Sequence, residues 1–158
     1  MKRAIVWGLS ASRVLLVPLV LAAVHRGDDD AAIVLLFVAA ASDVLDGALA
    51  RRWRVASDAG ARMDASADAV LLLSVLWALA DRGRALHAPL LLSLACFLHF
   101  ITTPRGVTRY DPIGRHLGTT LYIAVSLLLG ATDAWVAPIM LGVGTHALLT
   151  LWCRLRPG

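Results

Sequence analysis

The sequence predicts an all-α integral membrane protein with six transmembrane helices. The chain has 158 residues, of which 59% are hydrophobic and 16% are charged. Soluble domains carry about a quarter charged residues, and the mean hydropathy of this chain is +0.74. A helical span needs about 20 residues, so this length accommodates about six crossings and leaves little for a soluble domain. We therefore treat residues 1–158 as a single membrane domain.

Six apolar segments account for the predicted spans. The first is interrupted by Arg13 and Pro18 and lacks a small-residue cleavage site, so we expect a retained helix rather than a secretory signal. The second and third are uncharged only over residues 31–42 and 69–80, so each reaches spanning length only by including aspartates. The last three contain no Asp, Lys or Arg. The predicted helices cover residues 9–24, 31–50, 61–80, 86–103, 117–131 and 134–152.

The basic residues predict how the spans are oriented. If the amino terminus is cytoplasmic, eleven of the fifteen basic residues flank the spans on the cytoplasmic side, and the outer loops hold three, namely Arg26, Arg82 and Arg84. This bias places both termini in the cytoplasm, as expected for a bacterial inner (plasma) membrane protein. It also explains the sequence pI of about 9.8 without a nucleic-acid partner.

All eleven acidic residues are aspartates, and four of them fall within the second and third spans. At 100° per residue, one face of the second helix carries Asp43, Asp46, Gly47 and Ala50. Steps of four residues align Gly60, Asp64 and Asp68 on the third helix. In an antiparallel hairpin centred near residues 55 and 56, the four carboxylates lie at matched depths. We therefore expect a polar active-site cavity that opens to the cytoplasm.

Four carboxylates at membrane depth need compensating positive charge. Divalent cations with oxygen ligands are the usual compensation, and two Mg²⁺ ions would balance the four charges. A pair of such ions suits displacement at phosphorus. Gly47 and Gly60 allow a ligand to approach closely, and the planar guanidinium of Arg51 matches phosphate oxygens. The residues thus indicate metal-dependent phosphorus chemistry.

The spacing of these residues resembles the signature of the CDP-alcohol phosphotransferase family. The pattern D-x-x-D-G-x-x-A-R, then eight residues, then G-x-x-x-D-x-x-x-D is matched at all fixed positions between Asp43 and Asp68. The resemblance implies six transmembrane helices, a site open to the cytoplasm and a homodimer. Phosphatidylglycerophosphate synthases of this family share a first-helix pattern that is similar to Leu9, Ser10, Arg13 and Pro18 here.

The resemblance also implies roles for individual residues. Two Mg²⁺ or Mn²⁺ ions would be held by Asp43, Asp46, Asp64 and Asp68. The cytidine diphosphate portion would be bound by Asp43, Gly47, Ala50, Arg51 and Gly60. Asp68 would act as general base, so that an acceptor hydroxyl attacks the β-phosphorus of CDP-diacylglycerol and CMP leaves. Glycerol 3-phosphate is the leading acceptor; inositol phosphate, serine and a second phospholipid remain open.

Further arginines are candidates for binding the phosphate of the acceptor or of the lipid. Arg105, Arg109 and Arg115 lie in the longest cytoplasmic loop, where they also fit the positive-inside pattern. Arg13 would lie deep in the membrane if its helix began at Lys2. If Ser10 capped that helix, Arg13 would lie within one turn of the interface, where it could extend to the headgroups or contact lipid phosphate.

Two other kinds of protein use buried aspartates. An intramembrane prenyltransferase binds Mg²⁺ and diphosphate through two aspartate motifs, but that family is longer and its motifs are spaced differently. A small ion-coupled transporter carries protons or cations on such residues. It offers no reason for Gly47, Ala50, Arg51 and Gly60 at these positions.

Overall fold

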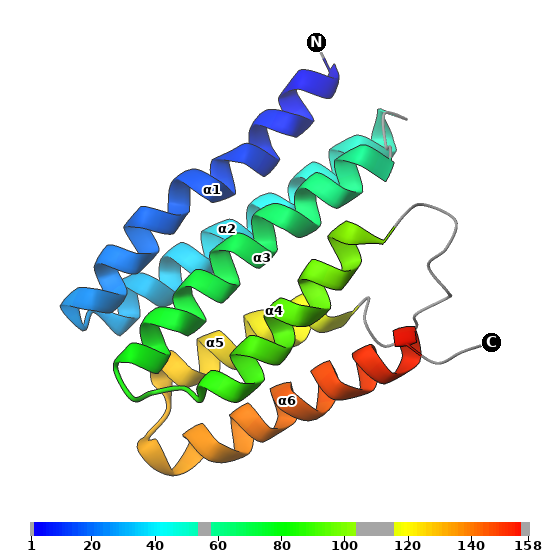
Figure 1. Cartoon of the computed structure of the whole chain (residues 1–158). Coiled ribbons are helices and arrows are strands. Elements are labelled where there is room, and N and C mark those ends of the chain that lie inside the picture. Colours follow the sequence, from blue (N-terminus) through cyan, green and yellow to red (C-terminus); the bar gives the residue numbers. More distant parts are fainter. Residues whose placement is uncertain (1, 54–57, 104–115, 156–158) are drawn as a thin grey trace. The chain divides into compact units, whose positions relative to one another are not determined.

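The chain folds into α-helices, which we describe from a computed structural model (Figure 1). The structure describes the backbone of residues 2–53, 58–103 and 116–155, and their side chains except those of residues 2–12, 50, 51, 58, 59 and 61. Within these ranges there is no strand. The helices are α1 (Lys2–Arg26), α2 (Asp29–Arg52), α3 (Asp58–Asp81), α4 (His87–Thr102), α5 (Leu117–Gly130) and α6 (Asp133–Leu155).

The predicted all-α class and the six predicted helices are confirmed, and most ends agree within three residues. The exception is α1, which begins at Lys2 instead of residue 9, so Ser10 lies inside the helix and does not cap it. Among the described residues, three segments are long and apolar enough to cross a membrane by length and composition, namely Asp29–Leu49, Arg62–Asp81 and Asp133–Leu155. The apolar helices α4 and α5 are shorter, with 16 and 14 residues.

Large apolar side chains cover the outer faces of the helices. Leu15 on α1 is 73% exposed, Phe37 on α2 is 67% exposed, and Trp152 on α6 is 59% exposed. Water would penalise so many exposed apolar groups, whereas lipid chains solvate them. Together with the apolar helices, these surfaces identify an integral membrane protein.

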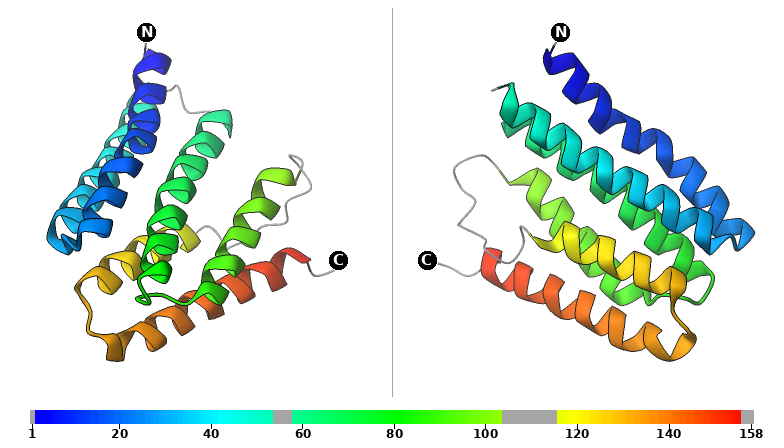
Figure 2. Two further views of the ribbon diagram at one scale, coloured as in Figure 1. Left: turned by 60° about the vertical axis from the view of Figure 1, so that its left-hand side comes forward. Right: turned by 180° about the vertical axis from the view of Figure 1, so that it is seen from behind.

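The helices group into two compact units, residues 1–75 and 76–158, with the boundary inside α3. In the first unit α1 and α2 form an antiparallel hairpin, seen from two sides in Figure 2. The turn depends on Gly27, whose φ of 77° is in the left-handed region that glycine adopts without strain. Its N–H donates to the Val24 carbonyl at 3.0 Å, and the Asp28 N–H donates to the Ala23 carbonyl at 3.0 Å. These two bonds end α1 in a Schellman motif.

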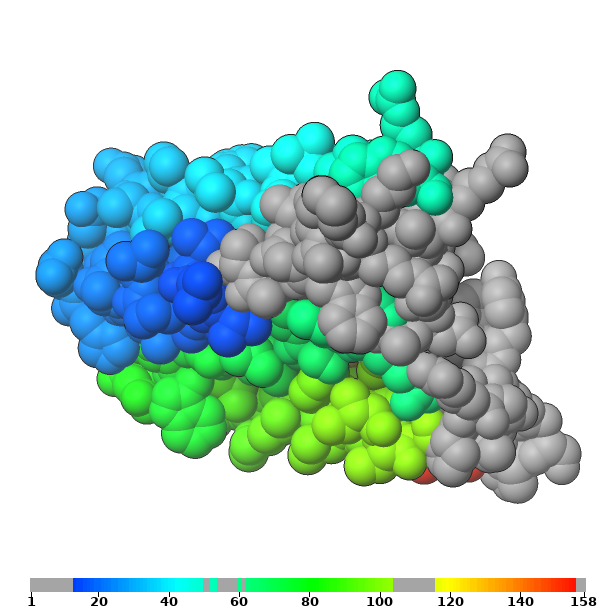
Figure 3. Space-filling view, turned by 90° about the horizontal axis from the view of Figure 1, so that it is seen from above, coloured from blue at the N-terminus to red at the C-terminus, as the bar shows by residue number. Residues whose placement is uncertain are grey.

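Close packing of α1 against α2 fixes the relative positions of these two helices, which carry Arg13, Asp43 and Asp46. Val20 and Val24 of α1 and Leu36 of α2 are at most 1% exposed. Small buried residues on α2, Ala32 and Ala39, allow the two helix backbones to approach closely. The space-filling view in Figure 3 shows the blue residues of α1 lying directly against those of α2.

In the second unit α6 packs against both α4 and α5. Arg84, which follows α3, donates from Nη2 to the carbonyls of Leu129 and Ala131, at 3.1 and 2.8 Å. These carbonyls belong to the end of α5, where they have no partner within the helix, so the guanidinium caps that helix. Arg154 of α6 donates to the Cys96 carbonyl of α4 at 2.9 Å. Both arginines therefore have structural roles within this unit.

Candidate active site

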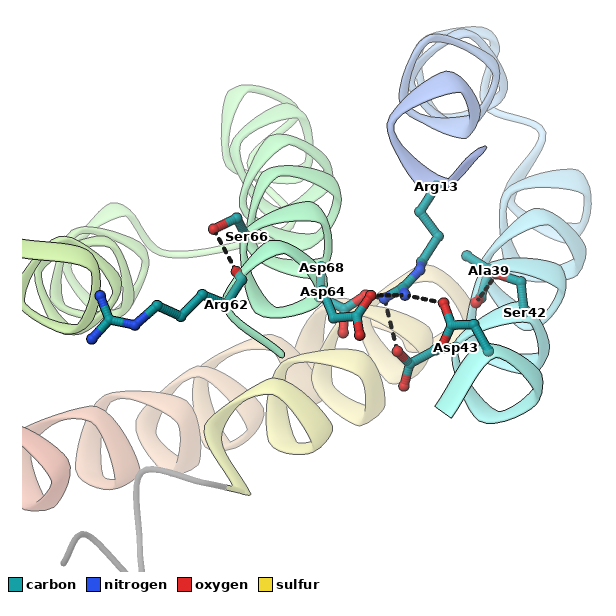
Figure 4. Close-up of polar contacts among 9 residues, drawn as sticks. Arg13, Ala39, Ser42, Asp43, Arg62, Asp64, Ser66 and Asp68 are labelled. Carbon is teal, nitrogen blue, oxygen red and sulfur yellow. Dashed lines mark hydrogen bonds and ion pairs between the residues drawn. The ribbon is translucent and has the colours of Figure 1, made fainter. Parts of the chain in front are cut away.

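The four aspartates of the motif converge because of their positions on two neighbouring helices. Asp43 and Asp46 lie near the carboxyl end of α2, and Asp64 and Asp68 lie in the first half of α3. Steps of three and four residues keep each pair on one face of its helix. Figure 4 shows Asp43 from α2 and Asp64 and Asp68 from α3 pointing toward one place. The convergence that the spacing predicted is present in the structure.

Arg13 of α1 lies at the centre of this cluster. Its Nη1 contacts Asp43 Oδ1 at 2.8 Å and also donates to Asp68 Oδ1. Its Nη2 lies 2.7 Å from Asp46 Oδ2 and 3.0 Å from Asp64 Oδ1. Because α1 begins at Lys2, Arg13 lies about 16 Å along the helix axis from that residue. Its side chain is 0% exposed, so it does not extend to the headgroups.

Burial differs among the carboxylates. The side chain of Asp46 is 1% exposed, whereas those of Asp68, Asp64 and Asp43 are 20%, 28% and 41% exposed. The cluster thus has a buried side at Asp46 and an accessible side at Asp43. Because four carboxylates face one guanidinium, the cluster keeps surplus negative charge when all four are ionised. Such a site attracts further cations.

The donor set fits a divalent metal. One carboxylate oxygen each from Asp43, Asp46 and Asp64 lies within 4.8 Å of the others. Hard oxygen donors at this separation suit Mg²⁺ and Mn²⁺. Among the described residues, Asp68 is not part of this group of three, and it joins the cluster through Arg13. Three of the four predicted ligands are therefore placed to share one ion.

Two serines beside the motif aspartates in the sequence donate hydrogen bonds within their own helices. Ser42 donates to the Ala39 carbonyl at 2.7 Å, and Ser66 donates to the Arg62 carbonyl at 2.8 Å. The side chain of Arg62 points away from the aspartates in Figure 4. Among the side chains that the structure describes, Arg13 is the cation that contacts these carboxylates.

Other predicted site residues are described only in part. Gly47 and Gly60 are half-buried, on α2 and α3. Ala50 and Arg51 belong to α2, but their side chains lie outside the described part of the chain. Arg105, Arg109 and Arg115 also lie outside the described residues. Their predicted roles in binding substrate stay predictions.

The family model described as CDP-alcohol phosphatidyltransferase matches residues 7–152, which is nearly the whole chain. The chain belongs to the CDP-alcohol phosphatidyltransferase family. Its members are membrane-embedded transferases that use CDP-linked alcohols, so this protein is an enzyme. A search of curated proteins found no match. The family match decides against the prenyltransferase and the ion-coupled transporter.

In this CDP-alcohol phosphatidyltransferase family member, the contacts of Arg13 with the aspartates were not predicted from the sequence. The interpretation that Arg13 extends to the interface was wrong, because its guanidinium is buried among the aspartates. One signal was available in the sequence. If the first helix begins at Lys2, Arg13 lies about three turns inside it and needs an internal partner, and the motif aspartates are the acidic residues predicted within the spans.

Proposed function

We propose that this enzyme transfers a phosphatidyl group from CDP-diacylglycerol to a small polar alcohol, with glycerol 3-phosphate as the leading acceptor. The observation that carries the proposal is the convergence of the motif carboxylates, three of which bring their oxygens within 4.8 Å. Inositol phosphate, serine and another phospholipid are the alternative acceptors. The reaction releases CMP in every case.

The proposed site uses the four carboxylates for two tasks, metal binding and proton acceptance. Asp43, Asp46 and Asp64, with Asp68, would hold two Mg²⁺ or Mn²⁺ ions. Bound there, the ions would stabilise negative charge on the attacking and leaving oxygens. Asp68, which is 20% exposed, would accept the proton of the acceptor hydroxyl. As this oxygen bonds to the β-phosphorus, the bond from that phosphorus to the CMP oxygen breaks, and CMP leaves with the electron pair.

Binding of the substrates is assigned to residues around the carboxylates. Asp43, Gly47, Ala50, Arg51 and Gly60 would hold the cytidine diphosphate portion. The basic residues of the predicted cytoplasmic loop, Arg105, Arg109 and Arg115, would bind the phosphate of the acceptor. The acyl chains remain in the bilayer, beside the exposed apolar faces of the helices. We expect a homodimer in a bacterial inner membrane, with the site and both termini on the cytoplasmic side.

The test is an acceptor panel. Purified protein in lipid vesicles that contain CDP-diacylglycerol receives Mg²⁺ or Mn²⁺ and one acceptor at a time, and CMP release and the mass of the lipid product are measured. Glycerol 3-phosphate is expected to give phosphatidylglycerophosphate. A double variant, Asp43→Asn with Asp64→Asn, is expected to lose the activity.

Asp30→Asn is the matched control. Asp30 lies in the first turn of the same helix as Asp43 and is exposed, so the same substitution there is expected to retain activity. No CMP release with any acceptor would overturn the proposed reaction. Full activity of the double variant would overturn the assignment of the metal ligands.

A further inference from the structure

A single arginine side chain contacts all four of the carboxylates to which we assign metal binding. The two Nη atoms of Arg13 divide the aspartates into two pairs, each with one residue from α2 and one from α3. Nη1 contacts Asp43 and Asp68, and Nη2 contacts Asp46 and Asp64. The guanidinium therefore contacts one oxygen of each carboxylate that would hold a metal ion.

These contacts do not use all the hydrogen-bond donors of Arg13. Its Nε is buried and has no hydrogen-bond partner among the described residues, although the side chain is 0% exposed. An arginine has five N–H donors, and a buried donor without an acceptor carries a free-energy cost. Both Nη atoms thus contact carboxylates, whereas the Nε–H has no acceptor among the described residues. This is the pattern of a charge attracted to the carboxylates rather than of a fully hydrogen-bonded structural arginine.

We propose that Arg13 is an internal counter-cation that competes with divalent metal ions for the four motif aspartates. The inference rests on the proposed function only in taking these aspartates as the metal ligands. In the protein without metal, the guanidinium neutralises part of the charge and holds carboxylates from two helices together. A metal ion at the same oxygens repels the guanidinium, so the side chain must withdraw from at least one pair as an ion enters. Arg13 is a positioning residue in this account, and it sets the affinity for metal.

Competition makes a prediction that a purely structural role does not. Removing a competing cation raises the affinity for the metal, whereas damaging the framework of the site lowers it. The full chain is purified in detergent, freed of metal with EDTA and titrated with Mn²⁺, and free Mn²⁺ is followed by electron paramagnetic resonance. In Arg13→Gln the dissociation constant for Mn²⁺ is expected to fall at least about tenfold. Its midpoint of thermal unfolding in EDTA is expected to fall as well.

Arg26→Gln is the matched control, since it removes the same charge from an exposed position on the same helix. It is expected to leave both readouts at the wild-type values. If Arg13→Gln does not fold in EDTA, the dissociation constant for Mn²⁺ is measured on Arg13→Lys instead. One ammonium does not span both pairs of aspartates, so the dissociation constant is expected to fall about threefold.

An unchanged or higher dissociation constant in the Arg13 variants would overturn the inference, as would the absence of Mn²⁺ binding to wild type and to both variants. Neither readout depends on turnover. Tighter binding of Mn²⁺ by the Arg13 variants without any CMP release by wild type would therefore reject the proposed reaction and leave the competition in place.

Discussion

Replacing Asp46 by Asn is expected to lower CMP release at least about a thousandfold. Asp46 is the most buried of the four carboxylates, at 1% exposure, so water screens its charge least. A unit charge 4 Å from a cation contributes about 4 kcal/mol at an effective dielectric constant of about 20. Loss of that contribution in the transition state corresponds to about three decades in rate. The assay is initial CMP release at saturating Mg²⁺, with Asp30→Asn as the control.

Asp46→Glu separates charge from geometry at the same position. The carboxylate is retained, but the extra methylene shifts it within a site that has almost no exposed surface. Activity is expected to fall at least about tenfold, because misplacing a group by about an ångström costs up to about a hundredfold. More than a tenth of wild-type activity in Asp46→Asn, or full activity in Asp46→Glu, would refute the reasoning from burial.

Two further predictions concern the framework. Arg84→Gln is expected to lower the free energy of unfolding by about 1 to 3 kcal/mol in a denaturation assay, because the end of α5 loses its two guanidinium hydrogen bonds; an unchanged stability would rule out the capping role. Gly27→Ala is expected to lower the free energy of unfolding by about 1 kcal/mol, because φ there is 77°. Gly142 is the control, since it is helical and an added Cβ meets nothing within 4 Å, so alanine there should not lower the stability. Equal effects at the two positions would contradict the role of Gly27 in the turn.

The sequence predicted the helices well because hydropathy and charge mark where a membrane span must lie. Hydropathy did not fix the start of α1, because residues 4–8 are also apolar and permit a helix that begins at Lys2 as well as one that begins near Ser10. The predicted ends of α2 and α3 were correct to within three residues, although aspartates lie inside both helices. There the uncharged runs alone are too short to span a membrane, so the sequence itself required the charges to be included.

The convergence of the aspartates was predictable from the sequence, because all four lie on two neighbouring helices. Spacing on α2 and α3 was enough to expect that Asp43, Asp46, Asp64 and Asp68 converge. The partner of these residues was not predictable in the same way, because Arg13 comes from a third helix whose rotation depends on packing against α2. Hydrophobic periodicity gives little information about rotation when a helix is apolar on most faces.

Locating the bound metal would test whether the motif aspartates are its ligands. Crystals of the full chain grown with Mn²⁺ and CDP would be measured at the manganese absorption edge, where anomalous scattering identifies the ion. We expect anomalous peaks beside the carboxylates of Asp43, Asp46 and Asp64, whose oxygens already lie within 4.8 Å of one another. Manganese bound elsewhere, with none at these three aspartates, would contradict this assignment.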